Sequence, residues 1–368
     1  MDEFMYEETS RNPFARLVRL SGHELHIGRK STPLEELNLP AMAEAYQRGK
    51  WLGGGGTERP VSAFGGVRDC VPVIRVTGSS KPVWPRRSVE FADTLGRFAV
   101  QRSGGPEQVR ALAAQAAAEG VPLWIARRFA PGPTGTISVA VDRRTPRVDV
   151  WAEGGVPVVR LRAPYGVSPD RNNPTRDLRL TIGEDVAELA ITTSRSVARN
   201  YVAVELPGGR RWELLPHSAR ASRLVRAGMP VALLGRPDAP VGRDVPMLPL
   251  ADVDYRGGDA LDAVLAHALA VSFGLGDSTG VVRFGSRHQL TGIDDPAVFA
   301  QRWYSGLAPG SEDSGPGASA DGWGAGDGGF GDGGFGGDGS GGGGGSESGG
   351  GGGGGGDGGG GGGGGGGG

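Results

Sequence analysis

One apolar stretch constrains this chain more than any other feature: GGDALDAVLAHALAVSFGLGD, from Gly257 to Asp277. Between Ala260 and Phe273 its strongly polar side chains are Asp262 and His267 alone. Asp259 is a good helix N-cap, and apolar residues recur after it at helical spacing, which predicts a helix over 259–273. Alanines occupy the face where a surface helix would carry Lys, Glu or Arg.

The length of this helix indicates where it lies. Some fifteen residues at about 1.5 Å each reach about 22 Å, short of a hydrocarbon core of about 30 Å. We therefore predict a helix buried on all sides, and no transmembrane segment. In a β-rich domain, a helix is buried in this way when a sheet wraps around it.

Strand-like runs precede the helix throughout 121–255. Eleven runs of alternating or β-branched residues are separated by turn residues, from VPLWIARRF at Val121 to MLPLADVDY ending at Tyr255. Many short, evenly spaced strands with Gly and Pro turns are typical of antiparallel sheets. The predicted fold class is mainly β (α+β), an antiparallel β-barrel or sandwich enclosing a C-terminal apolar helix.

An internal repeat supports β-hairpins within this region. GGVPVVRLRAP (Gly154–Pro164) aligns with AGMPVALLGRP (Ala227–Pro237) at a constant offset. Each copy follows an alternating strand, with glycine at the turn and proline at the start of the next strand. Duplication of a β-unit is the preferred interpretation, and chance similarity between two hairpins is the alternative.

The flanking segments divide the chain into three parts. Residues 1–83 form a mixed, partly irregular N-terminal segment, in which Ser31 or Thr32 is a candidate helix cap before STPLEELNLP. Residues 84–309 form the β-rich domain, with a helix at 106–119, the buried helix 259–273 and an amphipathic outer helix at 295–307. Residues 310–368 form a third part, the glycine-rich tail.

The tail differs sharply in composition from the rest. It holds 38 of the 71 glycines and eight acids, without Lys or Arg. Such a segment has too little apolar surface to offset the entropy of ordering, so we expect a disordered, acidic tail. The tail, or the outer helix 295–307, is a candidate docking segment for a protein partner.

Charge and cysteine content bear on partners and location. The formal charge of −2 becomes +6 when the eight tail acids are excluded. Anionic lipid is therefore a possible partner. Arginines in ARRF, DRRTPR and GGRRW are expected on the outer face of a sheet, and nucleic acid is not the expected partner. The single Cys70 and the polar N-terminus favour a cytoplasmic location.

The order of strand hairpins and one apolar helix resembles the tubby C-terminal-like superfamily, closest to its LURP-one-related and phospholipid-scramblase branches. The resemblance lies in YVAVELPGGRRWELL, SRLVRAGMPVALLGRP and VDYRGGDALDAVLAHALAVSFGL, and covers about 121–276. It implies a closed β-barrel around a C-terminal hydrophobic helix. No phosphoinositide-binding or calcium-binding motif of that superfamily can be matched residue by residue.

Candidate site residues are few. His267 is expected to be a neutral core histidine, or, if it lines a cavity with Asp262, a ligand contact. His23 and His26 are three apart, where a zinc helix motif needs four, so we predict no metal site. No catalytic residue or cofactor is assigned.

Three functions follow as hypotheses. The preferred one is a non-enzymatic binding or scaffolding protein of unknown ligand. The second is a peripheral protein that contacts anionic lipid through a scramblase-like fold. The third is an uncharacterised enzyme with its site in the N-terminal region.

Overall fold

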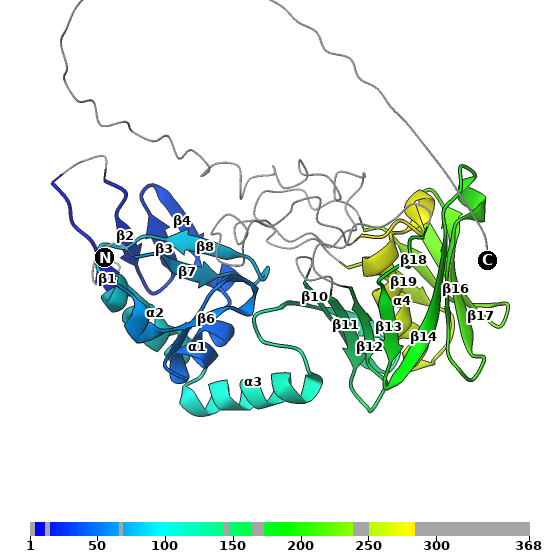
Figure 1. Cartoon of the computed structure of the whole chain (residues 1–368), viewed down its shortest axis with the longest axis horizontal. Helices are drawn as coiled ribbons and strands as arrows, with labels where there is room; N and C mark the ends of the chain where they lie inside the picture. The colour runs from blue at the N-terminus through cyan, green and yellow to red at the C-terminus, as the bar shows by residue number, and fades with distance from the viewer. Residues whose placement is uncertain are drawn as a thin grey trace, which may run out of the picture. The chain divides into compact units, whose positions relative to one another are not determined.

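The computed structural model describes residues 4–11, 15–65, 69–142, 147–163, 173–237 and 250–283. The predicted outer helix 295–307 and the glycine-rich tail lie outside these ranges. Within them the chain is mainly antiparallel β with four α-helices (Figure 1). No helix in the described ranges is long and apolar enough to cross a bilayer.

The N-terminal part combines short strands with three helices. Its strands are β1 (Tyr6–Glu7), β2 (Val18–Leu20), β3 (Glu24–Ile27), β4 (Lys30–Pro33), β5 (Lys50–Leu52), β6 (Glu58–Pro60), β7 (Val71–Ile74) and β8 (Ser80–Val83). The first four form one sheet, and the others pair as β5–β6 and β7–β8. Its helices are α1 (Leu39–Gln47), α2 (Ser88–Arg102) and α3 (Pro106–Glu119). One hydrophobic core joins these elements, from Tyr6 to Val109.

The helix predicted to begin at Ser31 or Thr32 begins later. Those residues lie in β4, which pairs with β3, so strand pairing takes the segment that local signals assigned to a helix start. The helix α1 starts at Leu39, and the side chain of Asn38 accepts a hydrogen bond from the Ala41 N–H. The prediction of a helix at 106–119 is confirmed: α3 has those bounds, and Gly120 ends it in the left-handed conformation.

All eleven predicted strands are present and form one sheet. They are β9 (Ala126–Gly132), β10 (Gly135–Asp142), β11 (Arg147–Ala152), β12 (Val159–Arg162), β13 (Arg179–Ile182), β14 (Asp185–Thr192), β15 (Tyr201–Glu205), β16 (Arg211–Ser218), β17 (Ala221–Arg226), β18 (Met229–Gly235) and β19 (Asp252–Tyr255). Each pairs antiparallel with the next in sequence, so the strands follow chain order from β9 to β19. No backbone pairing joins β9 to β19 among the described residues, and the sheet is open there.

The described residues of both copies of the internal repeat lie in β-hairpins of this sheet. The first spans the turn from β11 to β12, and the second spans the turn from β17 to β18. In the second, Ala227 and Gly228 have φ of 49° and 78°, which is the pattern of a type I′ turn.

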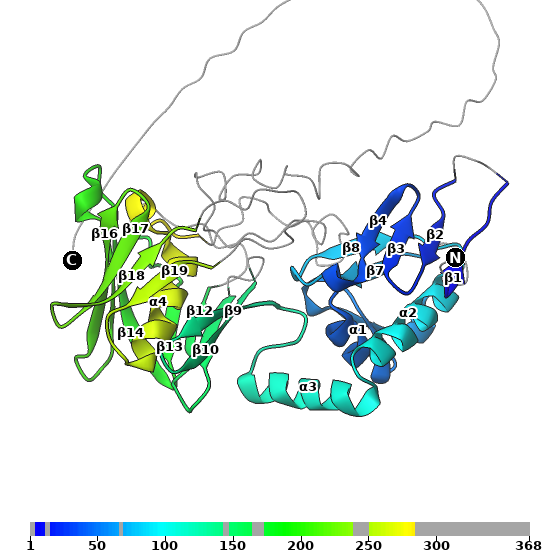
Figure 2. The ribbon, with the colours of Figure 1, turned by 180° about the vertical axis from the view of Figure 1, so that it is seen from behind.

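The apolar stretch forms α4 (Ala260–Phe273), and every residue from Leu261 to Phe273 is buried. The helix packs against β10, β11 and β12 and also against β18, near the two ends of the strand order. Figures 1 and 2 show its ribbon lying among the strands in both views. The sheet and α4 share one hydrophobic core. The alanine face of this helix is therefore buried together with its Leu and Val face.

Candidate functional site

The two residues predicted from the sequence both lie on α4 and are both buried, at different places. Asp262 and His267 are 2% and 1% exposed. Five residues of helix separate their directions by about 140° around the axis. Each contacts its own set of partners, and no described contact joins them.

Asp262 organises the first turn of α4. Its Oδ1 accepts a hydrogen bond of 2.7 Å from Trp212 Nε1, and its Oδ2 lies 3.3 Å from Arg226 Nη2. Burial raises the pKa of this carboxyl above its usual value, and the Trp212 hydrogen bond opposes that shift. Asp262 therefore acts as an anchor for the tryptophan on β16.

The helix cap completes this cluster at its solvent side. Asp259 accepts from the Leu261 N–H at 3.0 Å and pairs with both Arg210 and Arg226. The Arg210 guanidinium also lies 4.7 Å from the centre of the Trp212 ring. Burial alone would raise the pKa of Asp259, but hydrogen bonds from Arg226 and Leu261 lower it below its usual value. The negative charges of the two acids balance the positive charges of the two arginines. Because these ion pairs join the strands to the first turn of the helix, the cluster fixes the start of α4.

His267 lies against the last strand of the sheet. Its Nε2 is 2.9 Å from the Tyr255 hydroxyl, which donates a 3.1 Å hydrogen bond to the Pro131 carbonyl on β9. Since that hydroxyl proton points to Pro131, the neutral imidazole donates from Nε2. Burial, and then the charge of Arg128, lower the pKa of His267 to about 4. The residue is a neutral core histidine, and its Nδ1 makes no hydrogen bond with a described residue.

The expectation for the arginines of ARRF was wrong for one of them. Arg128 is 7% exposed and faces the interior beside Ala126 and Ala130, whereas Phe129 is 66% exposed. Strand alternation forces this choice, because placing both alanines inside also places Arg128 inside.

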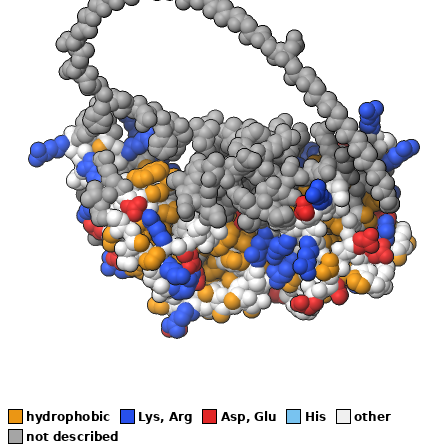
Figure 3. All heavy atoms as spheres, in the orientation of Figure 1, with side chains coloured by type: hydrophobic (Ala, Val, Ile, Leu, Met, Phe, Trp, Pro, Cys, Tyr) orange, Lys and Arg blue, Asp and Glu red, His pale blue; other side chains and the backbone are white. Residues whose placement is uncertain are grey.

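A second group of arginines lies around Asp149 on the other face of the sheet. Asp149 is fully buried and pairs with Arg147 at 2.7 Å and with Arg160 and Arg162 at 2.5 Å. Arg160 also donates to the Glu119 carbonyl at the end of α3. Figure 3 shows Lys and Arg side chains gathered on the surface near β11 and β12. Three guanidinium groups around one carboxylate leave a local excess of positive charge.

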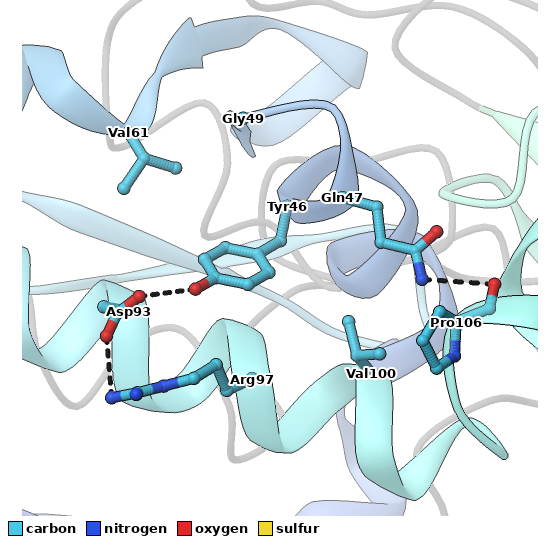
Figure 4. Close-up of a pocket in the computed structure, with 8 residues that line it drawn as sticks. All are labelled: Tyr46, Gln47, Gly49, Val61, Asp93, Arg97, Val100 and Pro106. Carbon is cyan, nitrogen blue, oxygen red and sulfur yellow. Dashed lines mark hydrogen bonds and ion pairs between the residues drawn. The ribbon is translucent and has the colours of Figure 1, made fainter.

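A solvent-open groove in the N-terminal part is the candidate ligand site. It has a volume of about 540 Å³ and is lined by Tyr46, Gln47, Gly49, Val61, Asp93, Arg97, Val100 and Pro106. Figure 4 shows Tyr46 and Arg97 both directed at Asp93, with Gln47 directed at Pro106. Sequence reasoning missed this groove, because its residues come from α1 and the turn after it, from a short 3-10 helix at Val61–Ala63, from α2 and from the start of α3.

The polar groups of the groove are mutually engaged. The Tyr46 hydroxyl donates to Asp93, and Arg97 pairs with the same carboxylate at 2.7 Å. Burial, followed by the hydrogen bond and charge of Asp93, raises the pKa of Tyr46 to about 12, so the phenol stays protonated. Gly96 makes this possible, because a Cβ there would overlap the Tyr46 ring. The groove therefore presents a fixed polar rim beside the apolar side chains of Val61 and Val100.

Neither metal-binding groups among the described residues nor similarity to known proteins identifies a further site. Among the described residues, no group of three His, Cys, Asp or Glu is placed to hold a metal ion. His26 lies in β3 and His23 just before it, so the two histidines do not share a helix. Comparisons with protein-family models, with curated proteins and with solved structures give no match.

Proposed function

We propose that this chain is a non-enzymatic binding or scaffolding protein whose ligand binds in the groove of Figure 4. The observation that carries the proposal is the lining of that groove, in which Val61 and Val100 are open to a ligand while Asp93 is already satisfied by Tyr46 and Arg97. Concave sites with apolar walls and a few fixed polar groups are typical ligand sites.

The chemistry of the lining favours a short peptide segment or a similar amphipathic ligand. Val61, Val100 and Pro106 offer contacts for one apolar side chain. The Gln47 amide donates one hydrogen bond to the Pro106 carbonyl and keeps its own oxygen as an acceptor for a ligand N–H. The described lining holds no His, Cys, Ser, Thr or Lys that would act as a nucleophile or base.

The proposed architecture behind this function is a barrel-like, tubby-like sheet around α4. Eleven antiparallel strands with a fully buried helix support it, as does contact of that helix with strands near both ends of the order. On this view the sheet and α4 form a rigid platform, and ligand binding resides elsewhere on the chain.

The groove is tested with a panel of blocked tripeptides that carry Leu, Phe, Pro, Arg or Asp at the centre. We expect saturation-transfer NMR to detect binding of at least one apolar member to the wild type. Val100→Glu should abolish it. Val89→Glu is the matched control, because Val89 is exposed on the same helix and outside the groove. Absence of any binding, or binding that survives Val100→Glu, would contradict the proposal.

Peripheral binding to anionic lipid is the second candidate, favoured by the arginine excess around Asp149. Phospholipid headgroups attract clustered arginine within about a Debye length. Co-sedimentation with vesicles of phosphatidylcholine, with and without phosphatidylserine, tests it. Greater recovery on the anionic vesicles is expected, and equal recovery on both would rule the lipid candidate out.

A further inference from the structure

The open sheet ends in two edge strands that run in the same direction. Every neighbouring pair between β9 and β19 is antiparallel, and ten such steps separate the two edges. An all-antiparallel sheet closes on itself only with an even number of strands. One additional strand between β9 and β19 would therefore be antiparallel to both.

The distance between the two edges is spanned by a side chain. At one end, the Tyr255 hydroxyl on β19 reaches the Pro131 carbonyl on β9. Directly paired strands lie about 4.8 Å apart, and the extended side chain of a tyrosine is longer than that spacing. The seam between β9 and β19, defined here by Ala126–Gly132 and Asp252–Tyr255, is thus bridged by Tyr255 instead of by backbone pairing.

The backbone groups of β9 that face the seam come from alternate residues. In an antiparallel pair, residues alternate between bonding the neighbour and pointing away from it. The Pro131 carbonyl points away from β10, since it accepts from Tyr255, so Phe129 and Arg127 have the same orientation. The N–H and C=O groups of Phe129 therefore face the seam. Among the described residues no strand pairs with them.

We infer that this seam accepts a single extended strand from a partner protein, by β-strand addition. This goes beyond the proposed groove and uses a different part of the molecule. Exposed strand edges are templates for such pairing, with main-chain hydrogen bonds supplying affinity. A strand in this position would also cover the outward Phe129.

A lone segment fits the seam better than a second copy of this chain. If β9 paired with β9 of a second copy, β10 of that copy would come to the position that β19 already occupies. The two strands would therefore overlap. Arg283, the last residue that the structure describes, lies at the end of the seam opposite to the one where such a strand must enter. The Arg283 N–H bonds the Ser272 carbonyl at the end of α4, the end of the sheet where β9 and β19 begin. A strand antiparallel to both must enter from the opposite end.

The neighbouring side chains define the chemistry of the partner segment. Ala130, Val253 and Tyr255 belong to the core side of the seam, so residues pointing inward should be small and apolar. Asp252 and Asp254 are exposed on the outer side. The partner is therefore an extended segment in which apolar residues alternate with polar or basic ones.

In the free protein, the Tyr255 hydroxyl donates to the Pro131 carbonyl, the acceptor that an N–H of the partner strand would use. When the strand enters, its N–H takes over the Pro131 carbonyl, and the Tyr255 hydroxyl keeps His267 as its partner. Tyr255→Phe should therefore free the carbonyl and tighten strand binding by about two- to tenfold.

The probe is a fluorescein-labelled peptide with the sequence of β10, Gly135–Asp142, which is the natural antiparallel partner of β9. Fluorescence anisotropy with the full chain should show binding. Phe129→Pro removes the N–H that faces the seam and keeps the bonds to β10, whereas Phe129→Thr keeps that N–H. We expect Phe129→Pro to weaken binding at least tenfold relative to Phe129→Thr, with circular dichroism unchanged.

Absence of peptide binding, or equal binding by the two Phe129 variants, would overturn the inference. Amide hydrogen exchange of the free wild type adds a further check. Fast exchange at Phe129 that slows on adding the peptide is expected. Protection of this amide without peptide would show that the chain fills its own seam, and would also overturn the inference.

Discussion

The Tyr255 hydroxyl lies 2.9 Å from Nε2 of His267, and this contact joins the edge strand β19 to the central helix α4. The same hydroxyl bonds Pro131 on β9, so one side chain connects the helix with both ends of the strand order. This histidine stays neutral, because burial and the charge of Arg128 both disfavour its protonated form.

Acid should therefore destabilise the protein through His267. Its pKa is about 4 in the folded chain and about 6.5 when unfolded. The unfolded state binds the proton first, so stability present above pH 6.5 is lost as pH falls to 4. The loss should reach about 3 kcal/mol. Urea unfolding of wild type and His267→Gln at pH 7 and pH 4.5 measures it.

The variant should show a weaker decrease in unfolding free energy between these two pH values. His217→Gln is the control, since His217 is exposed on β16. Identical pH dependence in wild type and His267→Gln would refute the attribution of the acid destabilisation to His267.

Asp262 provides a second prediction. Asp262→Ala leaves the buried Trp212 N–H without its acceptor, while Arg226 keeps its ion pair with Asp259, and this should cost about 2 kcal/mol of unfolding free energy. Asp262→Asn keeps an oxygen for Trp212 and should cost about 1 kcal/mol. Chemical denaturation distinguishes the two, and equal losses would mean that the Trp212 hydrogen bond contributes nothing.

The strands and α4 were predictable because their signals are local. Alternation from Val121 to Tyr255 indicates the eleven strands, and the apolar circumference of 259–273 indicates a buried helix. The partners of Asp262 were not predictable, because Trp212 lies fifty residues away in the sequence and meets it only in the folded chain.

Local signals also failed where two readings were equally good. Ser31 and Thr32 resemble helix caps as much as Asn38 does, and the pairing of β4 with β3 decides between them. The sequence is equally ambiguous about which residues of β9 face the core. ARRF allows Phe129 or Arg128 inside, and the alanines on either side of Arg128 settle it.

Asp149 should be the main electrostatic support for the junction of β11 and β12. Removing it leaves Arg147, Arg160 and Arg162 without a counterion. We expect Asp149→Ala to lower the unfolding free energy by about 2 kcal/mol, less than for a fully buried pair because the arginines are partly exposed. Thermal unfolding checks this, and Arg211→Ala, on an exposed surface pair, should have little effect. Equal melting temperatures for the two variants would contradict it.

The turn between β17 and β18 allows a stabilising change. Ala227 has φ of 49°, which costs an alanine about 1 kcal/mol and suits asparagine better. Ala227→Asn should therefore raise stability by about 0.5 kcal/mol. Gly228→Ala, at φ of 78°, should lower it. Denaturation midpoints that move in the opposite directions would exclude a type I′ turn here.

Burial of α4 is the central claim, and thiol accessibility measures it directly. With Cys70 replaced by Ala, Ala266→Cys places one thiol on a fully buried position of α4, and Val186→Cys places one on an exposed position of β14. We predict that a maleimide dye labels Cys at 186 within minutes and labels Cys at 266 only after unfolding in denaturant. Equal labelling rates in the native protein would show that α4 lies on the surface, and would contradict the fold described above.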